Sequence, residues 1–237
     1  MAAGRGLFAV ALVLLLLAAT SARADLAAGK KAYVANDYAT ALAEFRAAAA
    51  AGDADAKTRL AVMYLRGEAV DKDPAKAAAL LQEAAAADFA PAQFNLGRLY
   101  YAGLGVEQDP AAAATWFHRA VANGDMLSAQ ALSLLYHDGV GVERDLGKAV
   151  AFARQAADAG LPDAQYQLGV FYARGLGVEQ DLGEAYFWLF LAGQRGLTPA
   201  RMALPQLAVQ LSDDMQQEME KRAAAWVPRP SPAGAER

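Results

Sequence analysis

The sequence GLGVEQD occurs at residues 103–109 and again at 175–181. Glycine after an amphipathic stretch suits the left-handed residue that ends a helix. Asp109 followed by Pro110 suits an N-cap and the first position of the next helix. Alternating glycines are also typical of a phosphate-binding loop, but such a loop follows a strand, whereas a helix is predicted before each copy. We therefore interpret the segment as a helix stop followed by a helix start.

The loop is one part of a 36-residue repeat. Four full units cover residues 53–88, 89–124, 125–160 and 161–196. Seven positions of the repeat, here called columns, hold the same or a similar residue in all four units. In the first unit these positions are Leu60, Tyr64, Gly67, Asp73, Ala77, Leu80 and Ala84. A period of this length indicates a repeat protein in which neighbouring units bury a shared core.

Each unit is predicted to be an antiparallel pair of helices. In the second unit, Leu96 and Tyr100 are one helical turn apart, and Trp116 and Phe117 belong to the apolar stripe of the following helix. The alanine-rich composition also favours an all-α fold. Because Ala69 replaces the second glycine of the loop in the first unit, we expect that glycine to be dispensable.

The units AQFNLGRLYYAGLGVEQDPAAAATWFHRAVANG and AQYQLGVFYARGLGVEQDLGEAYFWLFLAGQRG resemble Sel1-like repeats, which are related to tetratricopeptide repeats. The resemblance is close over residues 53–196. It departs at Lys57 and Ala61, where Gln and Gly are usual, and at Ser133, where Gly is usual. The resemblance implies a right-handed α-solenoid of antiparallel helix pairs whose curved surface binds other proteins.

The N-terminus is typical of a signal peptide. Arg5, an apolar run over residues 7–19 and the small residues Ala22 and Ala24 form its three regions. The run is shorter than the roughly 20 residues needed to cross a bilayer as a helix. We expect cleavage after Ala24, which assigns residues 1–24 to the signal peptide. The mature chain would then be periplasmic or secreted, without stable membrane insertion.

The regions that flank the repeats are predicted to cap them. Residues 25–52 follow the repeat register weakly, with Glu44 in a column that is apolar in the later units, and are predicted to form an N-terminal capping helix pair. Residues 197–227 are predicted to form C-terminal capping helices, the second starting at Ser212 or Asp213. The proline-rich residues 228–237 are expected to form a disordered tail.

The composition excludes several classes of function. The chain has 26 acidic and 22 basic residues and a net charge of −4, which does not favour nucleic-acid binding. It has no cysteine, and its two histidines, His118 and His137, lie in different units. His118 shares a column with Gln82 and Arg154, which indicates a solvated face. We therefore predict no catalytic, metal-binding or cofactor-binding residue, and hence no enzyme.

Partner binding is expected where the units differ, because recurring columns maintain the fold. The first-helix stripe consists of the i, i+4, i+7 positions of each first helix, at residues 58, 62 and 65; 94, 98 and 101; 130, 134 and 137; and 166, 170 and 173. In related solenoids this stripe lines the concave groove. Aromatic and arginine side chains are typical of binding hot spots. The candidate partner-binding residues are Leu65, Phe94, Arg98, Tyr101, His137 and Tyr166. Each could equally be an ordinary inter-helix packing residue.

The sequence thus predicts an exported, monomeric, non-enzymatic scaffold for a protein or peptide partner. The family resemblance suggests a part in envelope assembly or in regulating an envelope signalling protein. Two rival functions remain: an enzyme that modifies the cell wall or β-lactams, and a secreted effector that binds host proteins. An activity screen on the mature protein would separate the first rival from a scaffold, and the protein's presence in the culture supernatant would favour the second.

Overall fold

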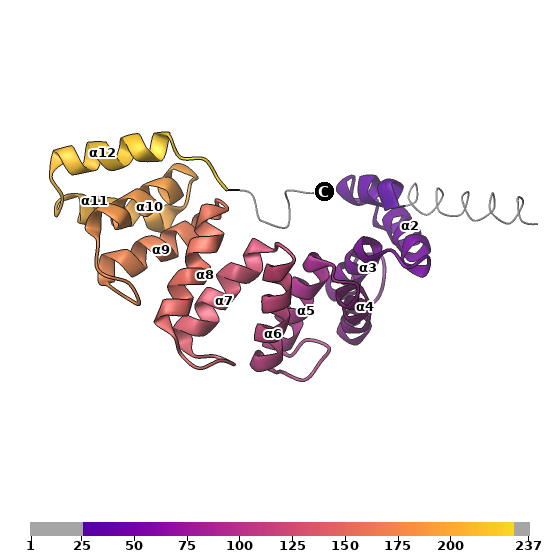
Figure 1. The fold of residues 1–237 in the computed structure, drawn as a ribbon. Helices are drawn as coiled ribbons and strands as arrows, with labels where there is room; N and C mark the ends of the chain where they lie inside the picture. Colours follow the sequence, from indigo (N-terminus) through magenta and orange to yellow (C-terminus); the bar gives the residue numbers. More distant parts are fainter. Residues whose placement is uncertain (1–25, 230–237) are drawn as a thin grey trace, which may run out of the picture. The chain divides into compact units, whose positions relative to one another are not determined.

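The computed structural model describes residues 26–229, and every regular element in that range is helical (Figure 1). The all-α repeat fold predicted from the sequence is confirmed. A helical segment at residues 26–34 comes first. The helices that follow are α2 (Tyr38–Ala50), α3 (Ala54–Arg66), α4 (Pro74–Ala86), α5 (Ala90–Ala102), α6 (Pro110–Ala122), α7 (Met126–Asp138), α8 (Leu146–Asp158), α9 (Pro162–Arg174), α10 (Leu182–Gln194), α11 (Thr198–Ala208) and α12 (Asp213–Ala224).

The repeated loop ends one helix and starts the next, as its residues predict. Gly103 follows α5 in the left-handed conformation, with φ of 67°, and its N–H donates to a carbonyl in the last turn. The carboxylate of Asp109 accepts hydrogen bonds from the N–H groups of Ala111 and Ala112 at the start of α6. The copy at residues 175–181 has the same two elements between α9 and α10.

On a scale larger than the 36-residue repeat, the chain divides into two compact units between Gln108 and Asp109. From here on, the first unit means the part that ends at Gln108 and the second unit the part that begins at Asp109. In the first unit α3 packs against α2 and α4, and α4 packs against α5. In the second unit α7 packs against α6 and α8, and α9 packs against α8 and α10. The recurring leucine of the first helices is fully buried at Leu96, Leu132 and Leu168. Each unit therefore has its own core, built from the columns that recur in the sequence.

The second glycine of the loop contacts the preceding repeat, so the expectation that it is dispensable was wrong. A Cβ atom at Gly105 would lie 2.0 Å from the carbonyl oxygen of Pro74. At Gly141 it would lie 2.3 Å from the carbonyl carbon of Pro110. Both prolines begin the second helix of the preceding repeat, where backbone atoms cannot move aside as a flexible side chain can. Ala69, by contrast, is exposed in the first repeat.

Helix α12 is attached to α10 by polar contacts. The Tyr186 hydroxyl donates a hydrogen bond to Glu220 at 2.8 Å, and Arg222 Nη2 donates to Glu184 at 3.2 Å. Burial, followed by the hydrogen bond to Glu220, raises the pKa of Tyr186 to about 12. The two predicted C-terminal helices are therefore present, and Ser212 caps the second through the N–H of Met215.

The segment after α12 returns to α8 and α10. Trp226 lies edge-on to Trp188. The Arg195 guanidinium lies 4.8 Å from the ring centroid of Trp226. The N–H of Arg229 donates to the carbonyl oxygen of Asp158 at 2.8 Å. Residues 228 and 229, which the sequence assigned to a disordered tail, are thus held against the second unit. The rest of that tail and the predicted signal peptide lie outside the described residues.

Within residues 26–229, no helix is both long enough and apolar enough to span a membrane.

We predict that Gly141→Ala destabilises the protein more than Gly139→Ala. Both glycines have positive φ, so each alanine costs about 1–2 kcal/mol in backbone strain. At Gly141 the overlap with Pro110 adds roughly 1–3 kcal/mol. At Gly139 the nearest atom to the new methyl group is the Arg144 Cβ, at 3.1 Å, and the nearest backbone atom is 3.5 Å away, which is an ordinary contact. Urea denaturation of both variants measures the difference, and equal losses would contradict the proposed contact between repeats.

Candidate functional site

The first-helix stripe of the first unit exposes an aromatic and a cationic side chain. Tyr101 is 46% exposed, and Arg98 is exposed with its guanidinium 5.7 Å from the ring centroid of Phe94. Phe94 and Leu65 are half-buried. The structure therefore brings Phe94 and Arg98 together on α5 and leaves part of each predicted side chain accessible to a partner.

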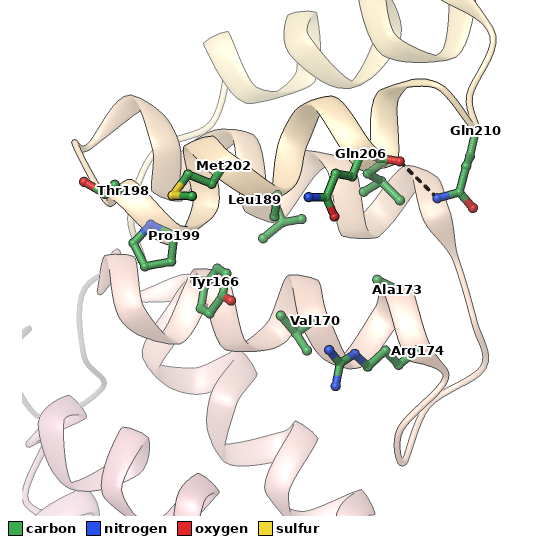
Figure 2. Close-up of a pocket in the computed structure, with 12 residues that line it drawn as sticks. Tyr166, Val170, Ala173, Arg174, Leu189, Thr198, Pro199, Met202, Gln206 and Gln210 are labelled. Atoms are coloured by element: carbon green, nitrogen blue, oxygen red, sulfur yellow. Dashed lines mark hydrogen bonds between the residues drawn. The ribbon is translucent and has the colours of Figure 1, made fainter.

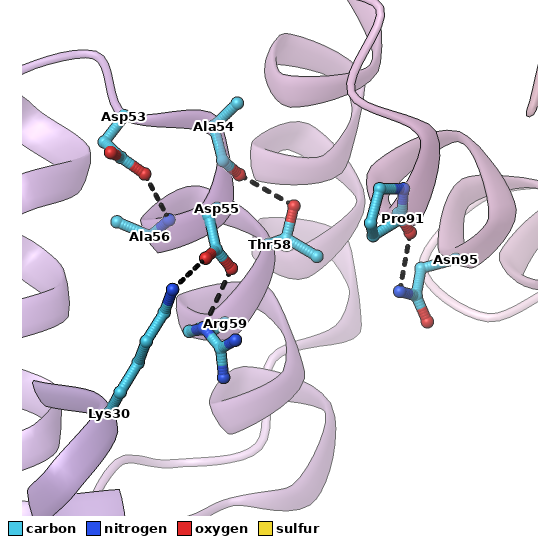
Figure 3. A network of polar contacts seen from close by, with 9 residues as sticks. All are labelled: Lys30, Asp53, Ala54, Asp55, Ala56, Thr58, Arg59, Pro91 and Asn95. Atoms are coloured by element: carbon cyan, nitrogen blue, oxygen red, sulfur yellow. Dashed lines mark hydrogen bonds and ion pairs between the residues drawn. The ribbon is translucent and has the colours of Figure 1, made fainter. Parts of the chain in front are cut away.

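Thr58, on the same stripe, serves packing instead. It is buried, and its hydroxyl donates to the carbonyl oxygen of Ala54 one turn earlier (Figure 3). Close by, Asp55 accepts from Lys30 at 2.6 Å and from Arg59 at 2.8 Å (Figure 3). These contacts join the helical segment 26–34 to α3. The start of α3 is thus fixed by capping and ion pairs, which makes it a poor binding surface.

In the second unit, His137 and Tyr166 are half-buried. The His137 ring lies 5.7 Å from the ring of Phe171, centroid to centroid, and its Nδ1 is 2.6 Å from Asp138 Oδ1. His137 is therefore engaged in contacts within the unit. The sequence also predicts that Leu65 and His137 lie on either side of Tyr101 along one peptide-binding path, and this stays a prediction.

Tyr166 lines a groove of about 640 Å³ formed by α9, α10 and α11 (Figure 2). We call it the α9–α11 groove. Leu189 and Leu207 are almost fully buried and form its floor, while Met202 is 69% exposed. Its lining residues are Tyr166, Val170, Ala173, Arg174, Leu189, Thr198, Pro199, Met202, Ala203, Gln206, Leu207 and Gln210.

The α11 wall of this groove was missed from the sequence, although the repeat register contains it. Met202 lies 36 residues after Tyr166, and Gln206 lies 36 residues after Val170. Helix α11 therefore supplies a further set of first-helix stripe positions, from a segment assigned only to capping. Continuing the 36-residue count past residue 196 would have found it.

Within residues 26–229, no group of three or more His, Cys, Asp or Glu side chains could hold a metal ion.

The Sel1 repeat model matches residues 54–89, 90–125, 127–161 and 162–197, which together exceed half of the chain. This chain belongs to the Sel1 repeat family. Sel1 repeat proteins are generally protein–protein interaction scaffolds. A comparison with curated proteins gave no match.

Two solved structures resemble this Sel1 repeat chain over most of its length. A Sel1 repeat protein from Oxalobacter formigenes shares 31% identity with a TM-score of 0.72, over 83% of this chain and 82% of that one. A protective antigen of uropathogenic Escherichia coli that displays an SLR fold shares 26% identity with a TM-score of 0.76. That alignment covers 86% of this chain but 45% of the Escherichia coli protein, so this chain spans less than half of that relative.

The Sel1 repeats of this chain are joined by hydrogen bonds to their recurring tyrosine. In each case the partner lies on the preceding second helix, 18 residues earlier. Gln82 donates to the Tyr100 hydroxyl at 3.4 Å, and His118 Nε2 lies 3.1 Å from the Tyr136 hydroxyl. Arg46 and Arg154 donate to Tyr64 and Tyr172. Gln82 and His118 are exposed, as the sequence predicts for this column, and the same column also contributes hydrogen bonds to the junctions between repeats.

His118 is the one member of this column whose ordinary pKa, about 6.5, is close to neutral pH. Its ring also lies edge-on to Phe152, with the centroids 5.4 Å apart. Burial lowers the pKa of His118, and the nearby Lys148 ammonium lowers it further. The junction between α6 and α7 therefore favours the neutral imidazole.

We predict that the free energy of unfolding falls with acidification below about pH 6.5, the ordinary pKa of histidine. The unfolded chain binds the His118 proton more readily than the folded one, so stability is lost as pH falls. His118→Gln should reduce this pH dependence, since Gln82 makes the corresponding hydrogen bond in the preceding repeat. Urea denaturation from pH 8 to pH 5 provides the measurement. Identical pH profiles for the two proteins would contradict the assignment.

Proposed function

We propose that this chain is an exported, non-enzymatic scaffold that binds a protein or peptide partner through its first-helix stripe. The proposal rests on a difference between two kinds of position in the repeat: the recurring leucine is buried, and several of the variable positions are exposed. Leu96 and its repeats are buried, whereas the stripe varies from unit to unit and leaves Tyr101, Leu134 and Met202 exposed. Exposed aromatic, methionine and arginine side chains are suited to partner binding. Membership of the Sel1 repeat family supports the same function.

Export is proposed from residues 1–24, whose charged, apolar and small-residue regions follow the order of a signal peptide. The partner would then be an envelope protein. Envelope assembly and the regulation of an envelope signalling protein are both consistent with a scaffold that presents a varied surface on a regular framework.

We predict that the mature protein begins at Asp25 and is released with the periplasmic contents. N-terminal sequencing of the protein purified from fractionated cells tests both points. Ala22→Lys should block processing, because the cleavage site requires small residues. An N-terminus at Met1 in the wild-type protein would contradict export by this route.

We predict that Arg98→Ala and Tyr101→Ala weaken partner binding while leaving the Tm nearly unchanged. Truncation of a hot-spot side chain typically costs about 2 kcal/mol or more in affinity, roughly a thirtyfold loss. An exposed substitution changes stability by only about 0.5 kcal/mol. A photo-crosslinking amino acid placed at residue 101 in living cells should capture a partner, and the Arg98→Ala background should reduce the yield.

The matched control is the same crosslinker at Ala79, an exposed position on the second helix α4 of the same unit. It should capture little. If the residue 79 probe captures the same proteins as the residue 101 probe, or if Arg98→Ala lowers the Tm without affecting capture, the first-helix stripe is not the binding surface.

A further inference from the structure

We propose that the α9–α11 groove binds an acidic segment of the protein partner. One large apolar side chain of that segment lies between Tyr166, Pro199 and Met202, and a carboxylate of the segment pairs with Arg174. This inference rests on the proposed scaffold function and adds to it the chemistry of the partner.

The groove has the form of a peptide-binding site. Its two most buried lining residues, Leu189 and Leu207, are apolar. Helices α9 and α11 form its walls (Figure 2). Met202 is 69% exposed on one wall and Tyr166 is half-buried on the other. Covering these side chains would remove apolar surface from water, at roughly 25 cal/mol per Å². Methionine also adapts its shape to different apolar partners.

The charge of the groove determines the sign of the charge on the partner segment. Arg174 is the only charged residue among those that line it, in a chain with 26 acidic and 22 basic residues. Arg174 is exposed and forms no ion pair with any residue in the range 26–229. A carboxylate can bind a guanidinium through two parallel hydrogen bonds. A nucleic acid would require clustered cations along its phosphates, which this lining lacks.

The positions of these groups determine the spacing in the partner. Tyr166 and Arg174 are eight residues apart on α9, which is about 12 Å at 1.5 Å per residue. An extended peptide advances about 3.3 Å per residue, so an apolar and an acidic residue four positions apart match this spacing, in either chain direction. Figure 2 shows Pro199 and Met202 near Tyr166, with Gln206 and Gln210 towards the other end of α11.

Two polar groups could bind the backbone of such a peptide. The Tyr166 hydroxyl and the Gln206 side-chain amide line the groove, and neither forms a hydrogen bond with a residue in the described range. Gln210 donates to the carbonyl oxygen of Gln206 at 3.1 Å, which holds the rim of the groove in place. An extended segment would therefore find donors and acceptors between its two anchored side chains.

A phage-displayed library of random decapeptides, selected on the intact mature protein, tests the proposal. Selected peptides should be enriched in a large apolar residue with Asp or Glu four positions before or after it. Synthetic versions of the strongest peptide, with its acidic residue retained or replaced by Lys, are then measured by fluorescence polarisation. The Lys version should bind at least tenfold more weakly.

Two pairs of variants locate the binding site. Arg174→Gln should abolish the preference for Glu over Lys, and Met202→Ala should weaken both peptides. The controls are Arg201→Gln and Val209→Ala, which change exposed residues near the same groove that do not line it. Both controls should bind like the wild-type protein.

Each other outcome overturns the inference. Selection of peptides without acidic residues, binding unaffected by Arg174→Gln, or failure to select any peptide would show that the groove does not recognise an acidic segment. In all three cases the scaffold function still stands if the crosslinker at residue 101 captures a partner. Loss of that capture would contradict the scaffold function itself, whatever the library yields.

Discussion

The close approach of backbone to backbone at the repeated loop is the constraint on which the fold depends. The backbone at Gly105, Gly141 and Gly177 lies close to the first residue of the second helix in the preceding repeat. A Cβ atom at any of these glycines would overlap that residue. The loop therefore ends a helix, starts another and contacts the neighbouring repeat. A side chain larger than hydrogen at these positions would overlap backbone atoms of the preceding repeat and push the two repeats apart.

The recurring columns follow from that spacing. Once the loop sets the distance between neighbouring helix pairs, the buried leucine and tyrosine must fill the same space in each repeat. The departures from the repeat pattern are compensated locally. Ser133, which stands where glycine is usual, is buried and donates to the carbonyl oxygen of Ala149 at 2.7 Å. A polar group is tolerated there because its hydrogen bond is formed.

This regular framework leaves the first-helix stripe free to vary. The Arg98 and Tyr101 side chains are exposed and form no hydrogen bond to another repeat within residues 26–229, so the identity of both residues can vary without loss of such a bond. The C-terminal helices extend the same arrangement. Helix α11 packs against α10 and lies in the register of a first helix, and α12 also packs against α10, through Tyr186 and Arg222. A segment that the sequence assigned to capping thus forms one wall of the α9–α11 groove.

Much of this fold could be predicted from the sequence, because the residues that determine the helices and their ends act locally and recur in every repeat. The helix ends at Gly103 and Asp109, the buried leucines and the family all follow from residue type and a 36-residue period. The exposed side chains of the stripe were found in the same way. Their neighbours were not, since no pattern along the chain states which side chains meet across two helices.

The sequence by itself determined the helices, their ends and the repeat, because capping and amphipathic periodicity act over a few residues. Only the tertiary structure decided three other features. It showed that the second glycine is a contact between repeats, that His118 belongs to a junction and that Arg174 and Met202 line one groove. Each depends on the distance between atoms from different helices, which is set by packing and not by the order of residues along the chain.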